Sequence, residues 1–355
     1  MAVRKLRVED FRCLGEVDVD PATGLNFFYG ENASGKTSLL EALFVLGRGR
    51  SFRASRKDVL IRDGKDAARV IVRGEGHAGT FQAGLEISGG RAELRVNGEP
   101  ASNVADVAER LPVEVIDPDV QDLVSGGPAE RRRYLDWSVF HVEPSFLGAW
   151  RRYQRALRHR TALLRQGARG RELDPWEEEM ELRARAIDEA RQRALAGIVP
   201  LVRDFGSSLL DAEIRLAYRA GHGEDSSLGT QLAAGRERDA KMGQTVKGPH
   251  RADVHVEVFD RRARGRVSRG QQKLVAASMI LGQHRYQAEA TGETGVLLVD
   301  DVSAELDRGR VGRLLEALSS IPGQVWITAL DRSDIGNLQP DRMFHVEQGT
   351  VTAVV

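Results

Sequence analysis

Residues 30–37 read Gly30-Glu31-Asn32-Ala33-Ser34-Gly35-Lys36-Thr37. This run matches the phosphate-binding pattern G-x-x-x-x-G-K-[ST] without a mismatch. It follows an apolar, strand-like run at residues 25–29 and leads through Ser38 into a helical pattern of apolar side chains. A strand, a glycine-rich turn and a helix in this order direct backbone N–H groups and a helix N-terminus at a phosphate. The run therefore predicts a nucleotide site, and the alternative is a glycine turn before an ordinary helix.

Two side chains of this run carry the expected chemistry. Lys36 is expected to reach the β- and γ-phosphates of the nucleotide, and Thr37 to place its hydroxyl on a magnesium ion. The predicted ligand is therefore a nucleotide together with Mg²⁺.

The composition describes an ordinary globular protein. Its 355 residues suggest about two domains, and they are 41% hydrophobic and 29% charged with a net charge of zero. Because there is no global basic field, any contact with DNA must come from local patches. Cys13 is the only cysteine, which excludes an intramolecular disulfide. No stretch approaches the ~20 apolar residues of a membrane span, and no signal core is visible, so we expect a cytoplasmic protein without a membrane partner.

The order of the predicted elements indicates an α/β core split by a helical insertion. Strands with one early helix fill residues 1–118, mostly helices fill residues 119–245, and strands alternate with helices in residues 246–355. Within the insertion, we expect the second long helix to end at Val199 and residues 229–238 to form a loop. The first and last segments are thus predicted to form one domain, and the middle segment a second.

A second motif can complete the nucleotide site. The apolar run Val296–Val299 ends in Asp300 and Asp301, and such a run is typical of a central parallel strand that is covered on both faces. Asp300 could hold the hydration shell of the magnesium ion, and Asp301 could orient an attacking water. The alternative is a core strand that ends in a solvated pair of aspartates.

A third motif is Ser268-Arg269-Gly270-Gln271-Gln272-Lys273, at the start of a predicted helix. Ser268 and Gln271 also fit a capping box, so a well-capped helix is the simpler interpretation. A glycine in the first turn costs about 1 kcal/mol relative to alanine, which is reasonable where a ligand must approach closely. The exposed helix N-terminus also suits a γ-phosphate. By contrast, Ser303–Asp307 indicates only a helix N-cap.

At this point the chain resembles the RecF family, the recombination mediator ATPases of the ABC and SMC-head type. Similar segments are spread from residue 10 to residue 307, so the resemblance covers essentially the whole chain. Besides the phosphate loop, they are Asp10-Phe11-Arg12, Arg50-Ser51-Phe52, Gly126-Gly127-Pro128, Arg131, Arg132, Leu135-Asp136-Trp137, Gly248-Pro249-His250, Ser268–Gln271, the two aspartates and Ser303–Asp307.

The resemblance implies an ABC-type ATPase head, with a mixed sheet and helices, that carries an inserted, mostly helical second domain. It also implies ATP and Mg²⁺ as cofactors and a weak, DNA-stimulated ATPase that acts mainly as a switch. Each site would join the phosphate loop of one subunit to Ser268 and Gly270 of another copy.

The implied roles can be assigned residue by residue. Catalysis would fall to Lys36, Ser268, Asp300 and Asp301, and the metal would be held by Thr37 and, through water, by Asp300. Nucleotide binding would involve Arg12, Gly30, Glu31, Asn32, Ala33, Ser34, Gly35, Lys36, Thr37, Ser38, Ser268, Gly270 and Asp307.

The function implied by the resemblance is recombinational DNA repair. An ATP-driven homodimer would clamp double-stranded, gapped or junction DNA and release it after slow hydrolysis, with RecO- and RecR-type proteins as partners. It would support recombinase loading, replication restart and the SOS response. The alternative is an SMC-like structural organiser of chromosomes, against which the absence of long heptad repeats argues. The motor subunit of a membrane transporter and a metabolic kinase are further alternatives.

Some positions depart from the wider ABC pattern. Asp301 stands where most ABC relatives have glutamate, which is one methylene longer. Gln121 lies near where a lobe-sensing glutamine is expected, and Thr328 is the nearest polar residue to a missing switch histidine. His250 could equally be a structural histidine.

Two arginine runs are candidates for contact with phosphates. The first is Arg151, Arg152, Arg155, Arg158 and Arg160, and the second is Arg261, Arg262, Arg264, Arg266 and Arg269. For the first run the alternative is a solvated helix face that pairs with Glu177, Glu178 and Glu179. Neither run shows base-reading chemistry, so we expect binding with little sequence preference.

Overall fold

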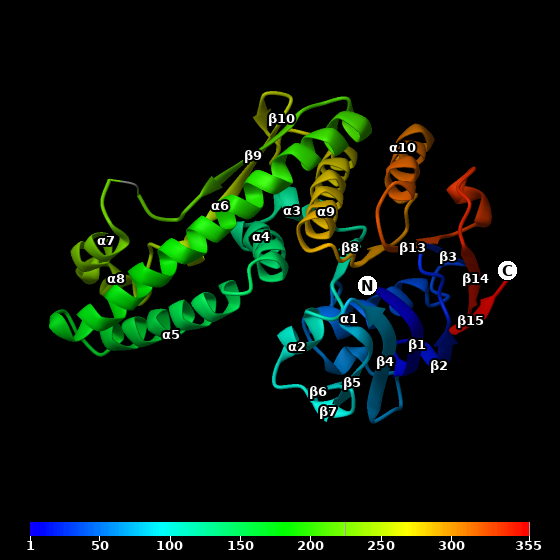
Figure 1. Ribbon diagram of the computed structural model, residues 1–355, viewed down its shortest axis with the longest axis horizontal. Helices are drawn as coiled ribbons and strands as arrows, with labels where there is room; N and C mark the ends of the chain where they lie inside the picture. Colours follow the sequence, from blue (N-terminus) through cyan, green and yellow to red (C-terminus); the bar gives the residue numbers. More distant parts are fainter. Residues whose placement is uncertain (224, 355) are drawn as a thin grey trace. The chain divides into compact units, whose positions relative to one another are not determined.

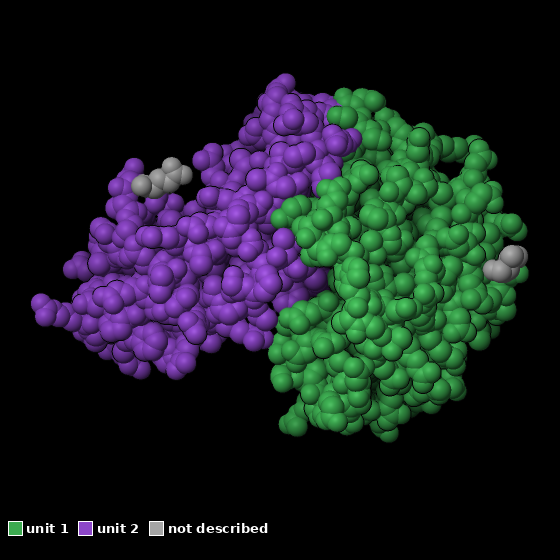
Figure 2. All heavy atoms as spheres, viewed as in Figure 1, with its two compact units in different colours: residues 1–120, 205–211, 269–355 green, residues 121–204, 212–268 purple. Residues whose placement is uncertain are grey.

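The computed structural model describes residues 1–223 and 225–354, and its chain divides into two compact units (Figure 1, Figure 2). Unit 1 consists of residues 1–120, 205–211 and 269–355, and unit 2 of residues 121–204 and 212–268. The sequence placed the first change of domain at residue 118, close to this division. It placed the second at residue 245, whereas residues 246–268 belong to unit 2 because their strands pair within that unit.

The first sheet of unit 1 is antiparallel, with the order β2-β1-β4-β5-β6-β7. Apolar and polar side chains alternate along its strands, which is the pattern of a sheet with one buried face. The tight turn at Asn97-Gly98 has positive φ at both residues, 50° and 87°, as this dipeptide predicts. The strands are β1 (Ala2–Phe11), β2 (Leu14–Val19), β4 (Ala67–Gly76), β5 (Gly79–Ser88), β6 (Arg91–Val96) and β7 (Glu99–Pro100).

The second sheet of unit 1 has the order β15-β14-β3-β13-β12-β8, and all its pairs are parallel except β14–β15. All four residues of β12 are buried, so the prediction of a central parallel strand is confirmed. The carboxyl ends of β3, β12 and β13 meet at one edge, where α/β sheets bind ligands. The strands are β3 (Leu25–Tyr29), β8 (Val113–Ile116), β12 (Val296–Val299), β13 (Gln324–Ala329), β14 (Arg342–Glu347) and β15 (Thr350–Ala353).

Helix α1 (Lys36–Arg48) packs against strands of both sheets. One hydrophobic cluster includes Leu39 and Leu43 of the helix, Val70 of the first sheet and Leu298 of the second. The mixed α/β architecture predicted from the sequence is therefore confirmed. Unit 1 also holds η1 (Asp58–Leu60), α2 (Val104–Ala108), α9 (Arg269–Thr291), α10 (Arg308–Ser319) and η4 (Arg332–Ile335).

Unit 2 is mostly helical, with a small antiparallel sheet in the order β11-β10-β9. Its helices are α3 (Asp122–Ser125), α4 (Pro128–Val142), α5 (Phe146–Arg165), η2 (Arg171–Leu173), α6 (Asp174–Leu210), α7 (Leu228–Ala234), α8 (Arg236–Met242) and η3 (Pro249–Arg251). Its strands are β9 (Ile214–Arg219), β10 (Asp253–Val258) and β11 (Arg261–Arg262). Across the described residues, every helix is too short or too polar to cross a bilayer.

Two expectations for the helical insertion were wrong. Helix α6 does not end at Val199 but continues through Pro200 to Leu210, and its last residues, 205–210, belong to unit 1. Residues 229–238 are not a loop but lie in α7 and α8. The glycines at residues 229 and 235 obscured these helices, whereas the Ser227 hydroxyl that accepts from the Thr230 N–H and the buried Leu232 stabilise α7.

Candidate functional site

The phosphate loop joins β3 to α1, as the sequence predicts. Gly30 and Gly35 have φ of 156° and 118°, in the region that favours glycine. At Gly30 a Cβ atom would lie 2.0 Å from the Val346 carbonyl oxygen, so no larger residue fits there. The loop is further held by the Gly349 N–H, which donates to the Ser34 carbonyl at 2.8 Å. The glycines of this motif are therefore required by the fold as well as by the expected ligand.

The Lys36 side chain is buried and folds back over the loop. Its ammonium group donates to the carbonyls of Gly30 at 2.5 Å and Glu31 at 2.8 Å. Burial lowers the pKa of Lys36, and the charges of Asp301 and Asp300 oppose this shift. Because two neutral carbonyls are weaker partners than an anion, the ammonium group is available to a phosphate that enters the loop.

Two threonines hold Asp300 at the end of β12. The hydroxyls of Thr37 and Thr328 both donate to Asp300 Oδ1, at 3.0 Å and 2.8 Å. Burial raises the pKa of Asp300, and these two hydrogen bonds act in the opposite direction. Thr328 also accepts from the Asp301 N–H at 2.8 Å, and Ser303 donates to Asp301 Oδ1 at 3.2 Å. The residue predicted in place of a switch histidine thus contacts both aspartates.

The donor set around Thr37 and Asp300 suits magnesium. Mg²⁺ is usually held by one or two carboxylates or hydroxyls together with waters and phosphate oxygens, rather than by an all-protein cage. The described residues contain no group of three or more His, Cys, Asp or Glu side chains that could hold a metal ion.

A cavity of about 770 Å³ opens around the phosphate loop. Of the predicted nucleotide-binding residues, Arg12, Asn32, Ala33, Ser34, Gly35, Lys36, Thr37 and Ser38 line it, together with Asp300, Asp301 and Thr328. Gly270 and Asp307, in the same unit, do not line it. The sequence did not single out the other lining residues, which are Cys13, Arg53, Asp58, Val59, Ile61, Asp63 and Leu330.

Arg12 lines this cavity and is held by a buried carboxylate of α1. Its guanidinium donates to both carboxylate oxygens of Glu41, at 2.9 Å and 2.7 Å, and to the Val59 carbonyl at 3.0 Å. Glu41 lies in α1, is fully buried, and also accepts from Ser51 at 2.5 Å. Arg12 therefore fixes the wall that carries Val59. In the sequence, a glutamate one helical turn after Thr37 is unusual for a buried helix face, but it does not identify Arg12 as its partner.

The start of α9 is tied to the segment that follows the two aspartates. Lys273 is buried and its ammonium group donates to the Ala304 carbonyl at 2.8 Å. Burial lowers its pKa, which the nearby charges of Asp301 and Glu305 oppose. Burial and the charge of Asp119 raise the pKa of Asp117, which follows β8, to about 7. Buried charges therefore gather around the carboxyl ends of β8 and β12.

Gly270 and Asp307, two of the predicted nucleotide-binding residues, lie in different local surroundings. At Gly270 a Cβ atom would meet the Arg310 guanidinium at 3.4 Å, the Glu305 carbonyl at 3.5 Å and the Leu306 side chain at 3.9 Å, which are ordinary contacts. Packing within the chain therefore does not require a glycine at this position. Asp307 is the N-cap of α10 and accepts from the Arg310 N–H at 3.0 Å, so the interpretation of this segment as an N-cap is confirmed.

In unit 2, the first arginine run divides into a buried and an exposed part. Arg160 is fully buried and donates to Glu177 at 2.9 Å, to Asp239 at 2.7 Å, to Thr245 at 2.8 Å and to the Leu232 carbonyl at 2.9 Å. Its assignment as a phosphate contact was wrong, because the guanidinium is inaccessible and its donors are occupied.

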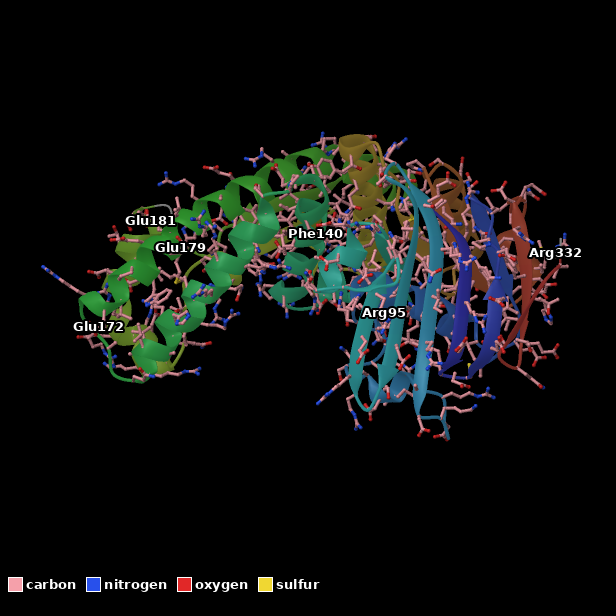
Figure 3. The ribbon with its side chains drawn as sticks, turned by 60° about the horizontal axis from the view of Figure 1, so that its bottom comes forward. Arg95, Phe140, Glu172, Glu179, Glu181 and Arg332 are labelled. Carbon is pink, nitrogen blue, oxygen red and sulfur yellow. The ribbon has the colours of Figure 1, made fainter. Side chains whose placement is uncertain are left out.

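The other four arginines of this run, Arg151, Arg152, Arg155 and Arg158, are exposed and form no ion pair with any described residue. Glu177 is committed to Arg160 and Arg236, and Glu179 (Figure 3) to Arg183. Pairing with these acids is therefore wrong for the exposed arginines. The arginines of the second run are likewise exposed and form no ion pair within the described chain.

The segment Gly248-Pro249-His250 is a structural junction of unit 2. His250 bonds the Tyr153 hydroxyl at 2.7 Å and the Thr245 carbonyl at 3.0 Å, and burial lowers its pKa to about 4. Arg191 donates to the Pro249 carbonyl at 2.8 Å and to Asp136 at 2.7 Å. These contacts support the structural interpretation of His250.

The carboxamide oxygen of Gln121 is buried with no partner among the described residues, and the role of Gln121 as a lobe sensor stays a prediction.

Comparisons with known proteins agree with this fold. The family model described as RecF/RecN/SMC N terminal domain matches residues 2–352. The DNA replication and repair protein RecF of Stenotrophomonas maltophilia (strain R551-3) is 37% identical over 368 residues, and the match covers 100% of both chains. A solved structure of the recombination mediator protein RecF-ATPrS in the RecFOR pathway has a TM-score of 0.85 and 25% identity, covering 99% of this chain and 98% of that one. The Smc head domain of Pyrococcus furiosus shares the fold, with a TM-score of 0.62 and 19% identity, covering 99% and 96%. The chain belongs to the RecF family.

Proposed function

We propose that this protein is an ATP-switched DNA-binding protein of recombinational repair. Two copies would close on double-stranded, gapped or junction DNA when ATP is bound, and slow hydrolysis would release them. The names of its relatives, a DNA replication and repair protein and a recombination mediator, support this role. RecO- and RecR-type proteins are the partners that we expect on the same grounds.

One observation supports the proposed dimer. The cavity of unit 1 holds the phosphate loop, Lys36 and the aspartates of β12, whereas Gly270 of the same unit lies outside its lining. Gly270 is nevertheless a glycine that packing within the chain does not require. We infer that Ser268 and Gly270 serve the cavity of a second copy, so that bound ATP has one copy on each side.

The chain's own residues divide the work within this site. Lys36 would exchange its two carbonyl partners for phosphate oxygens, which adds a charge-assisted interaction. Thr37 and Asp300 would hold Mg²⁺, which neutralises charge on the phosphates. Asp301 would orient the attacking water, and its carboxylate is positioned by Ser303. Because aspartate is shorter than the usual glutamate, we expect slow turnover, which suits a switch.

The proposed DNA contact is the exposed face of α5. Arg151, Arg155 and Arg158 are spaced at i, i+4 and i+7, and they therefore share one face of the helix. Buried Tyr153 and Arg160 anchor the helix in the unit. Unpaired guanidinium groups on a rigid helix suit the phosphates of DNA and read no sequence.

DNA binding measured together with nucleotide state tests the proposal. We expect a fluorescently labelled gapped duplex to be bound at least tenfold more tightly with ATP and Mg²⁺ than with ADP or without nucleotide. An unlabelled duplex of unrelated sequence should compete equally well. Equal affinity in the three nucleotide states would contradict the switch.

A further inference from the structure

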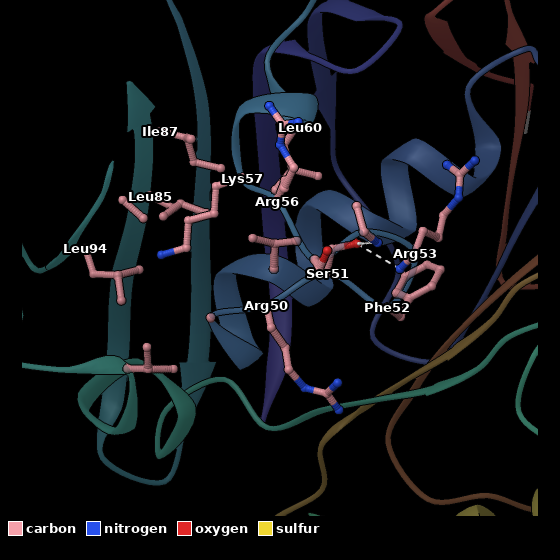
Figure 4. A pocket seen from close by; sticks show the side chains of 16 residues that line it. Arg50, Ser51, Phe52, Arg53, Arg56, Lys57, Leu60, Leu85, Ile87 and Leu94 are labelled. Atoms are coloured by element: carbon pink, nitrogen blue, oxygen red, sulfur yellow. Dashed lines mark hydrogen bonds between the residues drawn. The ribbon is translucent and has the colours of Figure 1, made fainter. Parts of the chain in front are cut away.

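A second cavity of about 430 Å³ lies in unit 1 (Figure 4), and Arg53 lines both this cavity and the nucleotide cavity. The segment Arg50–Lys57 forms one wall, and Leu85 and Ile87 of β5 with Leu94 of β6 form the other. Nothing in the proposed function uses this cavity. Its size lies within the range of ~300–1,000 Å³ that is typical of ligand pockets.

The side chains around this cavity carry charge of one sign. Arg50, Arg53, Arg56 and Lys57 belong to its lining, which contains no carboxylate among the described residues. Arg56 forms an exposed pair with Asp58, and Arg53 lies 3.5 Å from the buried Glu41. Lys57 forms no ion pair with any described residue, and it extends on the side of the cavity where Leu85 lies (Figure 4). A ligand that is complementary to this rim must be acidic.

The apolar wall of the cavity is aliphatic. Leu85, Ile87 and Leu94 come from the strands, and Val45 and Val104 from the helices α1 and α2. Among the described residues that line the cavity, Phe52 is the one aromatic, and it packs edge-on against Phe44 at 5.3 Å. Proteins that bind single-stranded nucleic acid use open aromatic faces on which bases stack. An aliphatic wall instead suits an apolar side chain of a peptide.

We propose that this cavity binds an acidic peptide segment of a partner protein, with one apolar side chain of the segment against Leu85, Ile87 and Leu94. The acidic residues of the segment contact Lys57 and Arg56 at the rim. This places the partner beside the nucleotide site, because Arg53 lines both cavities and Ser51 shares Glu41 with Arg12. The proposal does not depend on ATP, DNA or dimerisation.

A selection from random peptides tests the proposal without knowledge of the partner. The full-length protein, without nucleotide or DNA, is panned against a phage-displayed library of random octapeptides. We expect the enriched peptides to carry net negative charge and at least one large apolar residue. The consensus peptide, labelled with fluorescein, is then titrated with the protein by fluorescence anisotropy.

Variants locate the binding. We expect Lys57→Glu and Leu94→Asp each to weaken binding of the consensus peptide about tenfold. Lys57→Glu acts by charge repulsion, and Leu94→Asp places a polar group in the apolar wall. Arg95→Glu is the matched control, because Arg95 lies on β6 (Figure 3), is exposed and lines neither cavity. The affinity of this variant for the consensus peptide should stay within about twofold of the wild-type value. If Leu94→Asp lowers the melting temperature, Leu94→Ala takes its place.

Three results would overturn the proposal. The first is an enrichment of peptides that are not acidic. The second is a consensus peptide that binds both cavity variants as tightly as it binds the wild type. The third is that only the binding of a labelled oligothymidine, and not that of the peptide, is weakened by Lys57→Glu and Leu94→Asp. The last result would assign the cavity to nucleic acid.

Discussion

Two buried cations, Arg160 in unit 2 and Lys36 in unit 1, have very different surroundings. Arg160 donates to two carboxylates, a hydroxyl and a carbonyl, so its charge is balanced within the chain. Lys36 donates to two carbonyls and forms no ion pair within the described residues. Removing a charge from water is costly unless it is paired and hydrogen-bonded. A buried charge that is balanced within the chain therefore stabilises the fold, whereas an unbalanced one is available to a ligand.

The largest effect is expected for Arg160→Met. Asp239 would remain buried without its hydrogen-bonded arginine, and Glu177 would keep only Arg236, which should cost about 3–5 kcal/mol of unfolding free energy. Urea denaturation measures this cost. The exposed neighbour gives the control, since Arg158→Met should change stability by less than about 0.5 kcal/mol. Equal effects of the two variants would show that the buried ion pairs of Arg160 do not stabilise the fold.

Lys36→Met should act on the ligand and not on the fold. Loss of a charged partner of the phosphates should weaken ATP binding by about 2–5 kcal/mol, which corresponds to an affinity lower by roughly 30-fold to several thousand-fold. The unfolding free energy should not fall, because a desolvated cation is removed. Titration with a fluorescent ATP analogue measures the affinity, with the exposed Lys65→Met as control. A stability loss as large as that of Arg160→Met would assign Lys36 to the fold.

Lys36 and Arg160 also show which parts of the structure could be predicted from the sequence. The phosphate loop and the aspartates after β12 could be predicted, because each motif is local and its strand and helix carry a strong apolar pattern. The burial of Arg160 could not, since its partners Glu177 and Asp239 are 17 and 79 residues away. For the same reason, the pairing of Arg12 with Glu41 and the wall at Val59 emerged only from the structure.

His250 is a partly buried group that is held without charge, and it should make the stability of the protein depend on pH. Its folded pKa of about 4 lies below the ordinary 6.5, so the native protein binds fewer protons than the unfolded chain. The contribution of His250 to the free energy of unfolding is therefore complete above pH 6.5. It is lost as the pH falls towards 4, and the loss amounts to up to about 3 kcal/mol. His250→Gln should flatten the dependence of unfolding free energy on pH in this window. An unchanged slope would show that His250 is not held neutral.

The smallest effect is expected for the exposed arginines of α5. The triple variant Arg151→Gln, Arg155→Gln and Arg158→Gln should reduce the slope of log affinity for DNA against log salt by about 2–3, at about 0.9 for each lost phosphate contact. Its unfolding free energy and nucleotide affinity should match those of the wild type. The control replaces Arg183, Arg193 and Arg215, which pair with Glu179, Glu143 and Glu213. An equal loss in both triple variants would remove α5 from the DNA surface.

The central claim is that the nucleotide cavity is half of a site and that ATP joins it to a second copy. Asp301→Asn should bind ATP but orient the attacking water poorly, so the ATP-bound dimer should accumulate. Sedimentation velocity measures this directly, for wild type and variant, with and without ATP and Mg²⁺. We expect monomers without nucleotide and a stable dimer of the Asp301 variant with ATP. The same monomer under all four conditions would contradict it.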